Sequence, residues 1–220
     1  MLLQCETEPA SPAVDWLRAD MLASLRELNE EALELCAAAP AGGCAALGEI
    51  ARHWPRLDAA ARMRAAGCLY LLLDAGFADD EHLGCGAACR VHEAAPGCAP
   101  CFAPEAAAPV SQAVLTFAWH LARTEAAAAR LLLAVPAAGV AALAQLTLGE
   151  VRALARRCTA RLRPRWAQRP AVWREFLAAA AAEDAARLAR ARLRGQRLMA
   201  AELRQGPATS MSVFDRRTSA

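Results

Sequence analysis

Apolar side chains recur at steps of three and four residues along most of the chain, which is the period of an amphipathic α-helix. The clearest run follows Ser11-Pro12, a helix start with a Ser cap and Pro at the first helical position, and we predict that it ends near Ala39. Its apolar positions are Val14, Leu17, Met21, Leu25, Leu28, Ala32 and Leu35. Such a stripe usually faces the core of the protein, and a dimer interface is the alternative.

A second buried helix is expected in the first half of the chain. After a short helix within residues 44–53, Asp58 has the side chain of an N-cap, and Gly76 is a suitable residue to end the helix. The apolar positions between them are Met63, Ala66, Leu69, Tyr70 and Leu73. Because residues 69–73 are apolar on every side, we predict that this helix is surrounded by protein.

Two long helices are predicted in the second half. The first runs from about Ser111 to Ala134 and is stopped by Pro136, which lacks the N–H that a continuing helix needs. The second covers about residues 171–204, with a break at Glu183-Asp184 or at Gly195. Aromatic residues make up only 5% of the chain and β-branched residues are sparse. The predicted fold is therefore all-α, a helical bundle.

A tight turn is predicted between two short helices over residues 138–145 and 148–157. The turn is Leu146-Thr147, and Thr147 and Glu150 have the spacing of a capping box, in which each residue bonds the backbone N–H of the other. Two short helices joined in this way are typical of a helix-turn-helix. We therefore predict a helix-turn-helix-like C-terminal half.

The stretch Val114–Ala155 resembles FlhD, a bacterial flagellar transcriptional regulator, and aligns with that family's pattern without a gap. The most specific part, Ala141–Val151, reads AALAQLTLGEV and is similar to the family's TTLAALTLPQM segment. Leu131–Val135 stands where the family has its MFRLGI segment. The resemblance covers 42 of the 220 residues, so it says nothing of residues 1–110.

The resemblance implies a dimerising helical protein, expected here as a homodimer, that acts with a partner subunit such as FlhC to activate flagellar genes. The helix from Leu148 would then approach a groove of the DNA. Gly149 stands where the family has a proline, which leaves the DNA-facing surface open. The alternative function is a helical adaptor in flagellar or secretion control that does not bind DNA.

Charge is distributed unevenly along the chain. Residues 1–110 contain 7 Arg and 16 acidic residues, a net charge of −9, whereas residues 111–220 contain 18 Arg and 7 acidic residues, a net charge of +11. Such an asymmetry favours an anionic partner for the second half, DNA in this case. Mutual attraction of the two halves is the alternative.

Arginines are concentrated after the predicted turn, and their guanidinium groups match the geometry of phosphates. Our candidates for DNA contact are Arg152, Arg156, Arg157, Arg161, Arg163 and Arg165. The alternative is a solvated helix face, with Trp166 and Trp173 packed inward. The five arginines within residues 187–197 extend the basic character. We expect several of them to pair with Glu183, Asp184 and Glu202 at helical spacing.

Four cysteines lie close together in a segment rich in Gly and Pro. They are Cys85, Cys89, Cys98 and Cys101, with His82 and His92 as spare ligands. Four thiolates suit a structural zinc ion, and the last pair has a common zinc-knuckle spacing. A flexible loop without metal is the alternative, and the FlhD resemblance implies no such site.

Other classes of protein find little support. The sequence has no glycine-rich phosphate loop after a strand and no G-x-S-x-G motif, so we do not expect an enzyme. The N-terminus has no basic region followed by a long apolar stretch, and no uncharged apolar run is long enough to span a membrane. We expect a cytoplasmic protein with mostly reduced thiols.

The chain is predicted to contain four regions. These are an acidic helical region over 1–83, a Cys/Pro/Gly-rich loop or linker over 84–110, a basic FlhD-like helical domain over 111–206, and a disordered tail over 207–220. A faint internal echo crosses these boundaries. Arg62–Leu83 and Arg152–Trp173 share a helix, a cysteine and a following hydrophobic segment, which suggests a duplicated helical module.

Overall fold

The computed structural model describes residues 18–39, 47–48, 51, 53–77 and 100–205, and within them the protein is mostly helical. This confirms the predicted all-α fold. The α-helices are α1 (Ala19–Ala38), α3 (Ala59–Ala66), α5 (Pro104–Thr124), α6 (Ala126–Leu133), α7 (Ala137–Gln145), α8 (Leu148–Cys158), α9 (Pro170–Ala181) and α10 (Ala185–Gln205). The structure also has two 3-10 helices, η1 (Trp54–Arg56) and η2 (Thr159–Arg161), and two short strands, β1 (Leu73–Asp74) and β2 (Arg163–Pro164).

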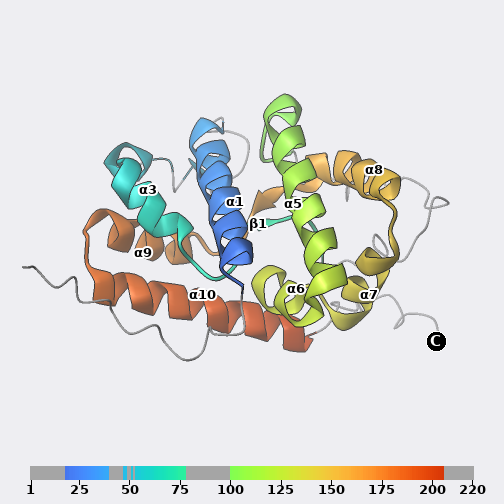
Figure 1. Cartoon of the computed structure of the whole chain (residues 1–220). Helices are drawn as coiled ribbons and strands as arrows, with labels where there is room; N and C mark the ends of the chain where they lie inside the picture. Colours follow the sequence, from blue (N-terminus) through green and yellow to red (C-terminus); the bar gives the residue numbers. More distant parts are fainter. Residues whose placement is uncertain (1–17, 40–46, 49–50, 52, 78–99, 206–220) are drawn as a thin grey trace, which may run out of the picture.

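Helices α1 and α5 lie next to each other at the centre of the molecule (Figure 1). Helix α3 packs on the outer side of α1, and α8 packs on the outer side of α5. Helix α10 crosses the other helices along one edge and contacts α9 and α6. The buried apolar side chains of all these helices form one continuous core.

The predicted stripe of α1 is confirmed where the structure describes it, because Met21, Leu25, Leu28, Ala32 and Leu35 are all buried. The helix ends at Ala38, as predicted. The proposed start at Ser11-Pro12 lies outside the described residues. The stripe therefore faces the core of its own chain, and the dimer-interface alternative is not needed to explain it.

One polar residue, Asn29, lies within the buried stripe of α1. Its side-chain amide donates to the carbonyl oxygens of Ala66 and Tyr70 at 3.2 and 3.0 Å, and its Oδ1 accepts from the backbone N–H of Leu72 at 2.9 Å. No local pattern predicted this role for Asn29, because its partners lie 37 to 43 residues away. Asn29 supplies hydrogen bonds to a buried segment that has left the helix.

Replacing Asn29 with leucine should lower the free energy of unfolding by about 2 kcal/mol. The leucine preserves much of the volume but leaves the buried N–H of Leu72 without an acceptor, and an unpaired buried group costs about 1–3 kcal/mol. Urea denaturation of both proteins measures the difference. An exposed neighbour, Glu31→Leu, is the control, and a loss equal to that of the control would show that the hydrogen bonds are not needed.

The predicted helix from Asp58 to Leu73 is too long. Asp58 is its N-cap, as predicted, with Oδ1 accepting from the N–H of Ala61 at 2.7 Å, but α3 ends at Ala66. The next residues, Cys68–Leu73, are not helical. All of them are buried except Leu69, which is partly buried. Their apolar character reflects burial. Their backbone N–H and carbonyl groups bond to Asn29 and to other segments, and not to one another as in a helix.

The helix predicted from Ser111 to Ala134 is two helices. Helix α5 begins earlier than predicted, with Pro104 in its first turn. The helical conformation is interrupted at Glu125, whose φ of −144° and ψ of 70° are not helical. The break predicted near Glu183-Asp184 is confirmed, since Glu183 has a φ of 56° between α9 and α10. Gly195 remains inside α10.

Strands β1 and β2 pair in antiparallel orientation, with Leu73 opposite Pro164 and Asp74 opposite Arg163. Each strand belongs to one of the two segments that share the internal echo. The two strands therefore bring described parts of these segments together between α1 and α5 (Figure 1).

Candidate nucleic-acid interface

The turn between α7 and α8 has the capping box that the sequence predicted. The hydroxyl of Thr147 accepts from the backbone N–H of Glu150 at 3.3 Å, and the Glu150 carboxylate accepts from the N–H of Thr147 at 2.8 Å. The backbone and hydroxyl hydrogen bonds from Thr147 hold the pKa of Glu150 below its usual value. The start of α8 is therefore fixed, and its first acidic side chain is occupied by the cap.

A tryptophan that sequence reasoning overlooked ties this turn to α5. The indole N–H of Trp119 donates to the carbonyl oxygen of Leu146 at 2.8 Å. The Arg123 guanidinium lies 5.0 Å from the centre of the Trp119 ring, which is a cation–π arrangement. The spacing of Trp119 and Arg123 on one helix face was the available signal, but their partner in the turn is distant in sequence.

Helix α8 has one buried face and one basic face. Val151, Leu154, Ala155 and Cys158 are buried, largely against α5. The hydroxyl of Ser111 on α5 donates to the carbonyl oxygen of Ala155 at 2.8 Å, which locks the two helices together. Orientation of α8 is thus set by the core, and its remaining side chains point outward.

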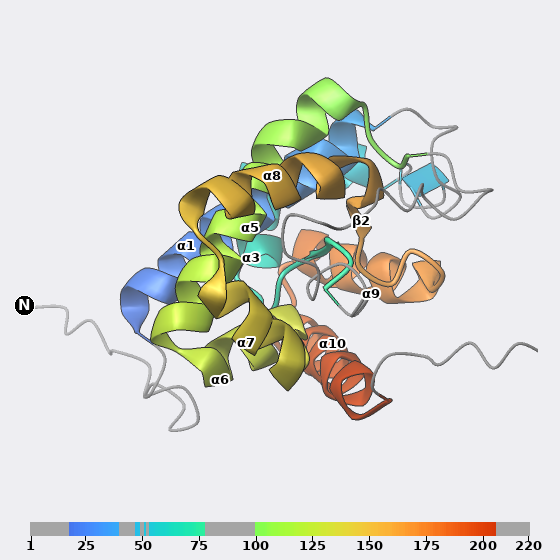
Figure 2. The same ribbon diagram turned by 90° about the vertical axis from the view of Figure 1, so that its right-hand side faces the viewer.

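Three candidate arginines, Arg152, Arg156 and Arg157, are exposed on α8. Arg152 and Arg156 are one turn apart on the same side of the helix, about 6 Å along its axis. Among the residues that the structure describes, none of the three forms an ion pair. Figure 2 shows α8 running across the outside of the molecule. The helix presents three positive charges to solvent.

The N-terminal end of the same helix is open. Leu148 is 44% exposed, and a Cβ built on Gly149 would meet nothing within 4 Å. The residue at this point is therefore free to approach a flat or grooved partner closely. An uncharged helix start beside exposed arginines suits a partner whose backbone carries negative charge.

Arg161 and Arg163 are less available than the three arginines of α8. Arg161 is half-buried in η2. Arg163 donates two hydrogen bonds to one carboxylate oxygen of Asp74, at 3.0 and 2.9 Å. Burial would raise the pKa of Asp74, but the charges of Arg165 and Arg163 and the N–H of Gly76 hold it below its usual value. Arg163 is therefore already paired with an ionised carboxylate.

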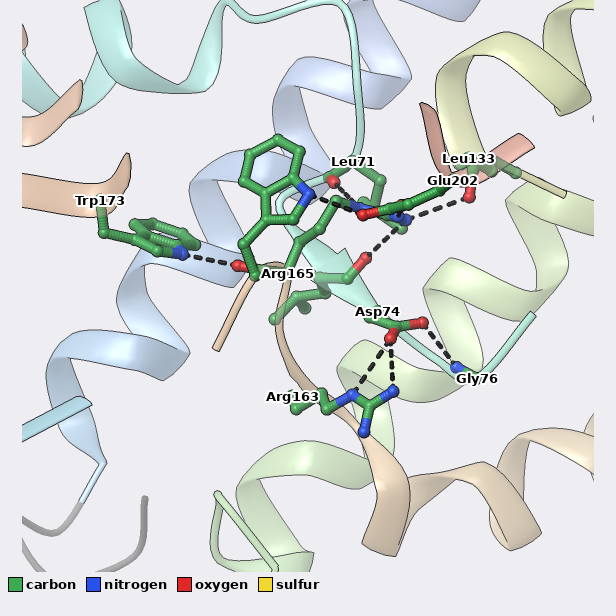
Figure 3. Close-up of polar contacts among 10 residues, drawn as sticks. Leu71, Asp74, Gly76, Leu133, Arg163, Arg165, Trp173 and Glu202 are labelled. Atoms are coloured by element: carbon green, nitrogen blue, oxygen red, sulfur yellow. Dashed lines mark hydrogen bonds and ion pairs between the residues drawn. The ribbon is translucent and has the colours of Figure 1, made fainter. Parts of the chain in front are cut away.

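The prediction that Arg165 contacts DNA is wrong, because Arg165 is 4% exposed and lies in the interior (Figure 3). Its guanidinium donates to the carbonyl oxygens of Leu71 at 2.9 Å, Leu73 at 3.3 Å and Leu133 at 3.0 Å, and to Glu202 at 3.1 Å. Arg165 thus joins β1, the end of α6 and α10. Its role is to hold these elements together.

The two tryptophans near Arg165 pack inward, as the structural alternative for them predicted. Trp173 is 1% exposed, and its indole N–H donates to the carbonyl oxygen of Arg165 at 2.6 Å. The indole of Trp166 donates to Glu202 at 2.7 Å, and its ring meets Tyr70 edge to face with centroids 5.3 Å apart. The Trp173 ring is therefore enclosed by the core, and the half-buried Trp166 has its indole N–H and its ring engaged within the chain.

A second basic surface follows α10. Its exposed arginines are Arg187, Arg190, Arg194, Arg197 and Arg204. The pairings predicted for this helix are wrong, because Arg194 pairs with Glu175 of α9, Glu183 with Arg64 and Glu202 with Arg165. Asp184 caps α10 by accepting from the N–H of Arg187. This surface provides a matched comparison for the basic face of α8.

The predicted zinc site falls largely outside the described residues. Cys85, Cys89 and Cys98 are in that part of the chain, as are His82 and His92, and Cys101 is half-buried. Within the described ranges no group of three potential ligands comes together. Zinc binding stays a prediction. The same ranges contain no helix that is both long and apolar enough to cross a membrane.

No family model, curated protein or solved structure matches this chain.

Proposed function

We propose that the protein is a DNA-binding transcription regulator of the FlhD type, acting in the cytoplasm with a partner subunit on flagellar genes. The observation that carries this proposal is the basic face of α8, defined by Arg152, Arg156 and Arg157. These three arginines are exposed and lack acidic partners in the described part of the chain. They lie on a helix whose start is fixed by a capped turn.

The chemistry of the basic face suits phosphate. A guanidinium group remains charged at every physiological pH and donates to two phosphate oxygens at once. Helix-turn-helix proteins place the second helix in the major groove, with its N-terminal residues next to base edges. In α8 these residues are Leu148 and Gly149, which are exposed and uncharged. On this proposal the arginines set the position of the helix on the backbone.

The FlhD resemblance supports the same assignment from a separate direction. It covers Val114–Ala155, which spans most of α5, all of α6 and α7, and most of α8. The four helices that build and orient the basic face are therefore the four that carry the resemblance. Activation of flagellar genes and the need for an FlhC-like partner come from this resemblance alone.

Neutralising the basic face should weaken binding to a labelled random-sequence duplex. We expect Arg152→Gln/Arg156→Gln/Arg157→Gln to reduce affinity by on the order of 10- to 100-fold at low salt. Three lost phosphate contacts should also reduce the slope of log affinity against log salt by about 3, since each contact contributes about 0.9. Fluorescence anisotropy over a series of salt concentrations measures both quantities.

The control removes the same charge from α10 with Arg187→Gln/Arg190→Gln/Arg197→Gln. We expect this variant to retain most of the affinity and most of the slope. Equal losses for the two variants would mean that total charge, rather than α8, determines binding. An absence of binding by the unaltered protein, alone and with a partner recovered from the host, would favour the adaptor function.

A further inference from the structure

Within the described parts of the two echo segments, the strand pairing is symmetric under exchange of the segments. Cys158 follows Cys68 by 90 residues, and at this difference Leu73 corresponds to Arg163 and Asp74 to Pro164. Leu73 pairs with Pro164, and Asp74 pairs with Arg163. Exchanging the two segments therefore converts each pair into the other, as in the isologous contact of a symmetric dimer.

The helices around the strands follow the same relation. Helix α1 packs on α3, α5 packs on α8, and α1 packs on α5. Figures 1 and 2 show α1 and α5 running in opposite directions, with α3 and α8 on their outer sides. The order α3, α1, α5, α8 therefore reads the same from either end, as a long and a short helix in each half.

A polar contact joins the long and the short helix in each half, at positions that the 90-residue difference does not relate, since it matches Asn29 with Trp119. Asn29 of α1 donates to the carbonyl oxygen of Ala66, the last residue of α3. Ser111 of α5 donates to the carbonyl oxygen of Ala155, in the last turn of α8. In both halves a buried side chain of the long helix thus holds the C-terminal end of the short helix.

The two short helices differ in their outer surfaces. On α3 the residues that correspond to Arg156 and Arg157 are Ala66 and Gly67, and only Arg62 matches an arginine of α8. The other arginine of α3, Arg64, donates to the carbonyl oxygen of Ala180 and pairs with Glu183. Helix α3 therefore does not carry the equivalent of the basic face of α8.

We propose that the chain is an internal pseudo-dimer that engages one DNA half-site per chain. The first half supplies the packing that a second subunit would supply, so the expected homodimer is not required, and only α8 docks on DNA. This inference rests on the proposed function. Dimeric helix-turn-helix proteins place two equivalent helices on half-sites one helical turn apart, whereas the described part of this chain has one helix with the basic face.

Selection of bound sequences from a random duplex library, with the full chain, tests the number of half-sites. We expect an uninterrupted motif without inverted symmetry, bound by one chain of 23.3 kDa per duplex. An inverted repeat with centres about 10 base pairs apart, bound by two chains, would overturn the inference and leave the DNA-binding function intact.

A pair of corresponding substitutions tests the same point without knowledge of the site. Arg62→Gln on α3 and Arg152→Gln on α8 remove matched, exposed arginines. We expect Arg152→Gln to reduce the salt slope by about 1 and Arg62→Gln to leave it unchanged. Equal reductions would mean that both halves contact DNA, which contradicts a single half-site.

The mass of the free protein separates failure of the two proposals. If the chain binds no duplex, the DNA-binding function fails and the single half-site fails with it. The pseudo-dimer is still tested, because sedimentation should give the 23.3 kDa of one chain. A stable species of twice that mass would overturn the claim that the first half replaces a second subunit.

Discussion

Replacing Arg165 with methionine should lower the free energy of unfolding by about 3–5 kcal/mol, the cost of removing one member of a buried charged network. The guanidinium is the donor for three backbone carbonyl oxygens and the ionic partner of Glu202. Methionine fills part of the volume but donates nothing, so the carbonyls of Leu71, Leu73 and Leu133 lose these hydrogen bonds. Equilibrium denaturation in guanidinium chloride measures the change.

The control is Arg169→Met, which makes the same chemical change at an exposed position. Its effect should stay within about 0.5 kcal/mol, as is usual for surface substitutions. A loss below about 1 kcal/mol for Arg165→Met would contradict a structural role for this arginine and would reopen its assignment as a DNA contact.

Replacing Gly195 with alanine should destabilise the protein by about 3 kcal/mol, because the added carbon has no space. A Cβ at this position of α10 would lie 2.7 Å from Cε1 of Tyr70 and nearer still to its Cζ and hydroxyl oxygen. Tyr70 is 1% exposed and its ring is held against Trp166, so it has no room to move. Thermal and chemical denaturation both measure the loss.

The same substitution in α8 gives the opposite expectation. Gly149→Ala meets open space, and alanine favours a helix over glycine by up to about 1 kcal/mol, so stability should be unchanged or slightly higher. In a Tyr70→Ala background the penalty of Gly195→Ala should largely disappear. A penalty that persists in that background would show that contact with Tyr70 is not its cause.

Local signals in the sequence predicted local structure well. The caps at Asp58 and Thr147 were recognisable because each depends on residues within one helical turn. The buried stripe of α1 was predictable for the same reason, since its period belongs to a single helix. The capped turn before α8 and the arginines on its outer face could therefore be identified from the sequence.

Contacts between distant segments were not predictable in the same way. Arg165 lies in a run of arginines, and nothing local distinguishes it from its neighbours. Its three carbonyl partners come from residues 71, 73 and 133, which are brought together only by the fold. The charge of Arg165 alone suggested a position on the surface. In the fold, three backbone carbonyl oxygens converge on its guanidinium and accept hydrogen bonds from it, which stabilises the buried position.

The end of α3 was missed for a related reason. Leu69–Leu73 is apolar on all sides, which suits a buried helix and a buried irregular segment equally well. The decisive partner is Asn29, more than thirty residues earlier, whose amide and carbonyl satisfy the backbone of this segment. Gly67, directly after the helix, was the one local sign of its end.

Chromatin immunoprecipitation of the tagged protein in its native host tests the central claim most directly, because any partner subunit is then present. We predict enrichment at discrete promoters that is lost in Arg152→Gln/Arg156→Gln/Arg157→Gln and kept in Arg187→Gln/Arg190→Gln/Arg197→Gln, with all three proteins at equal abundance. No enrichment under motile conditions with stable protein present, or enrichment that survives loss of the α8 arginines, would contradict DNA binding through this face.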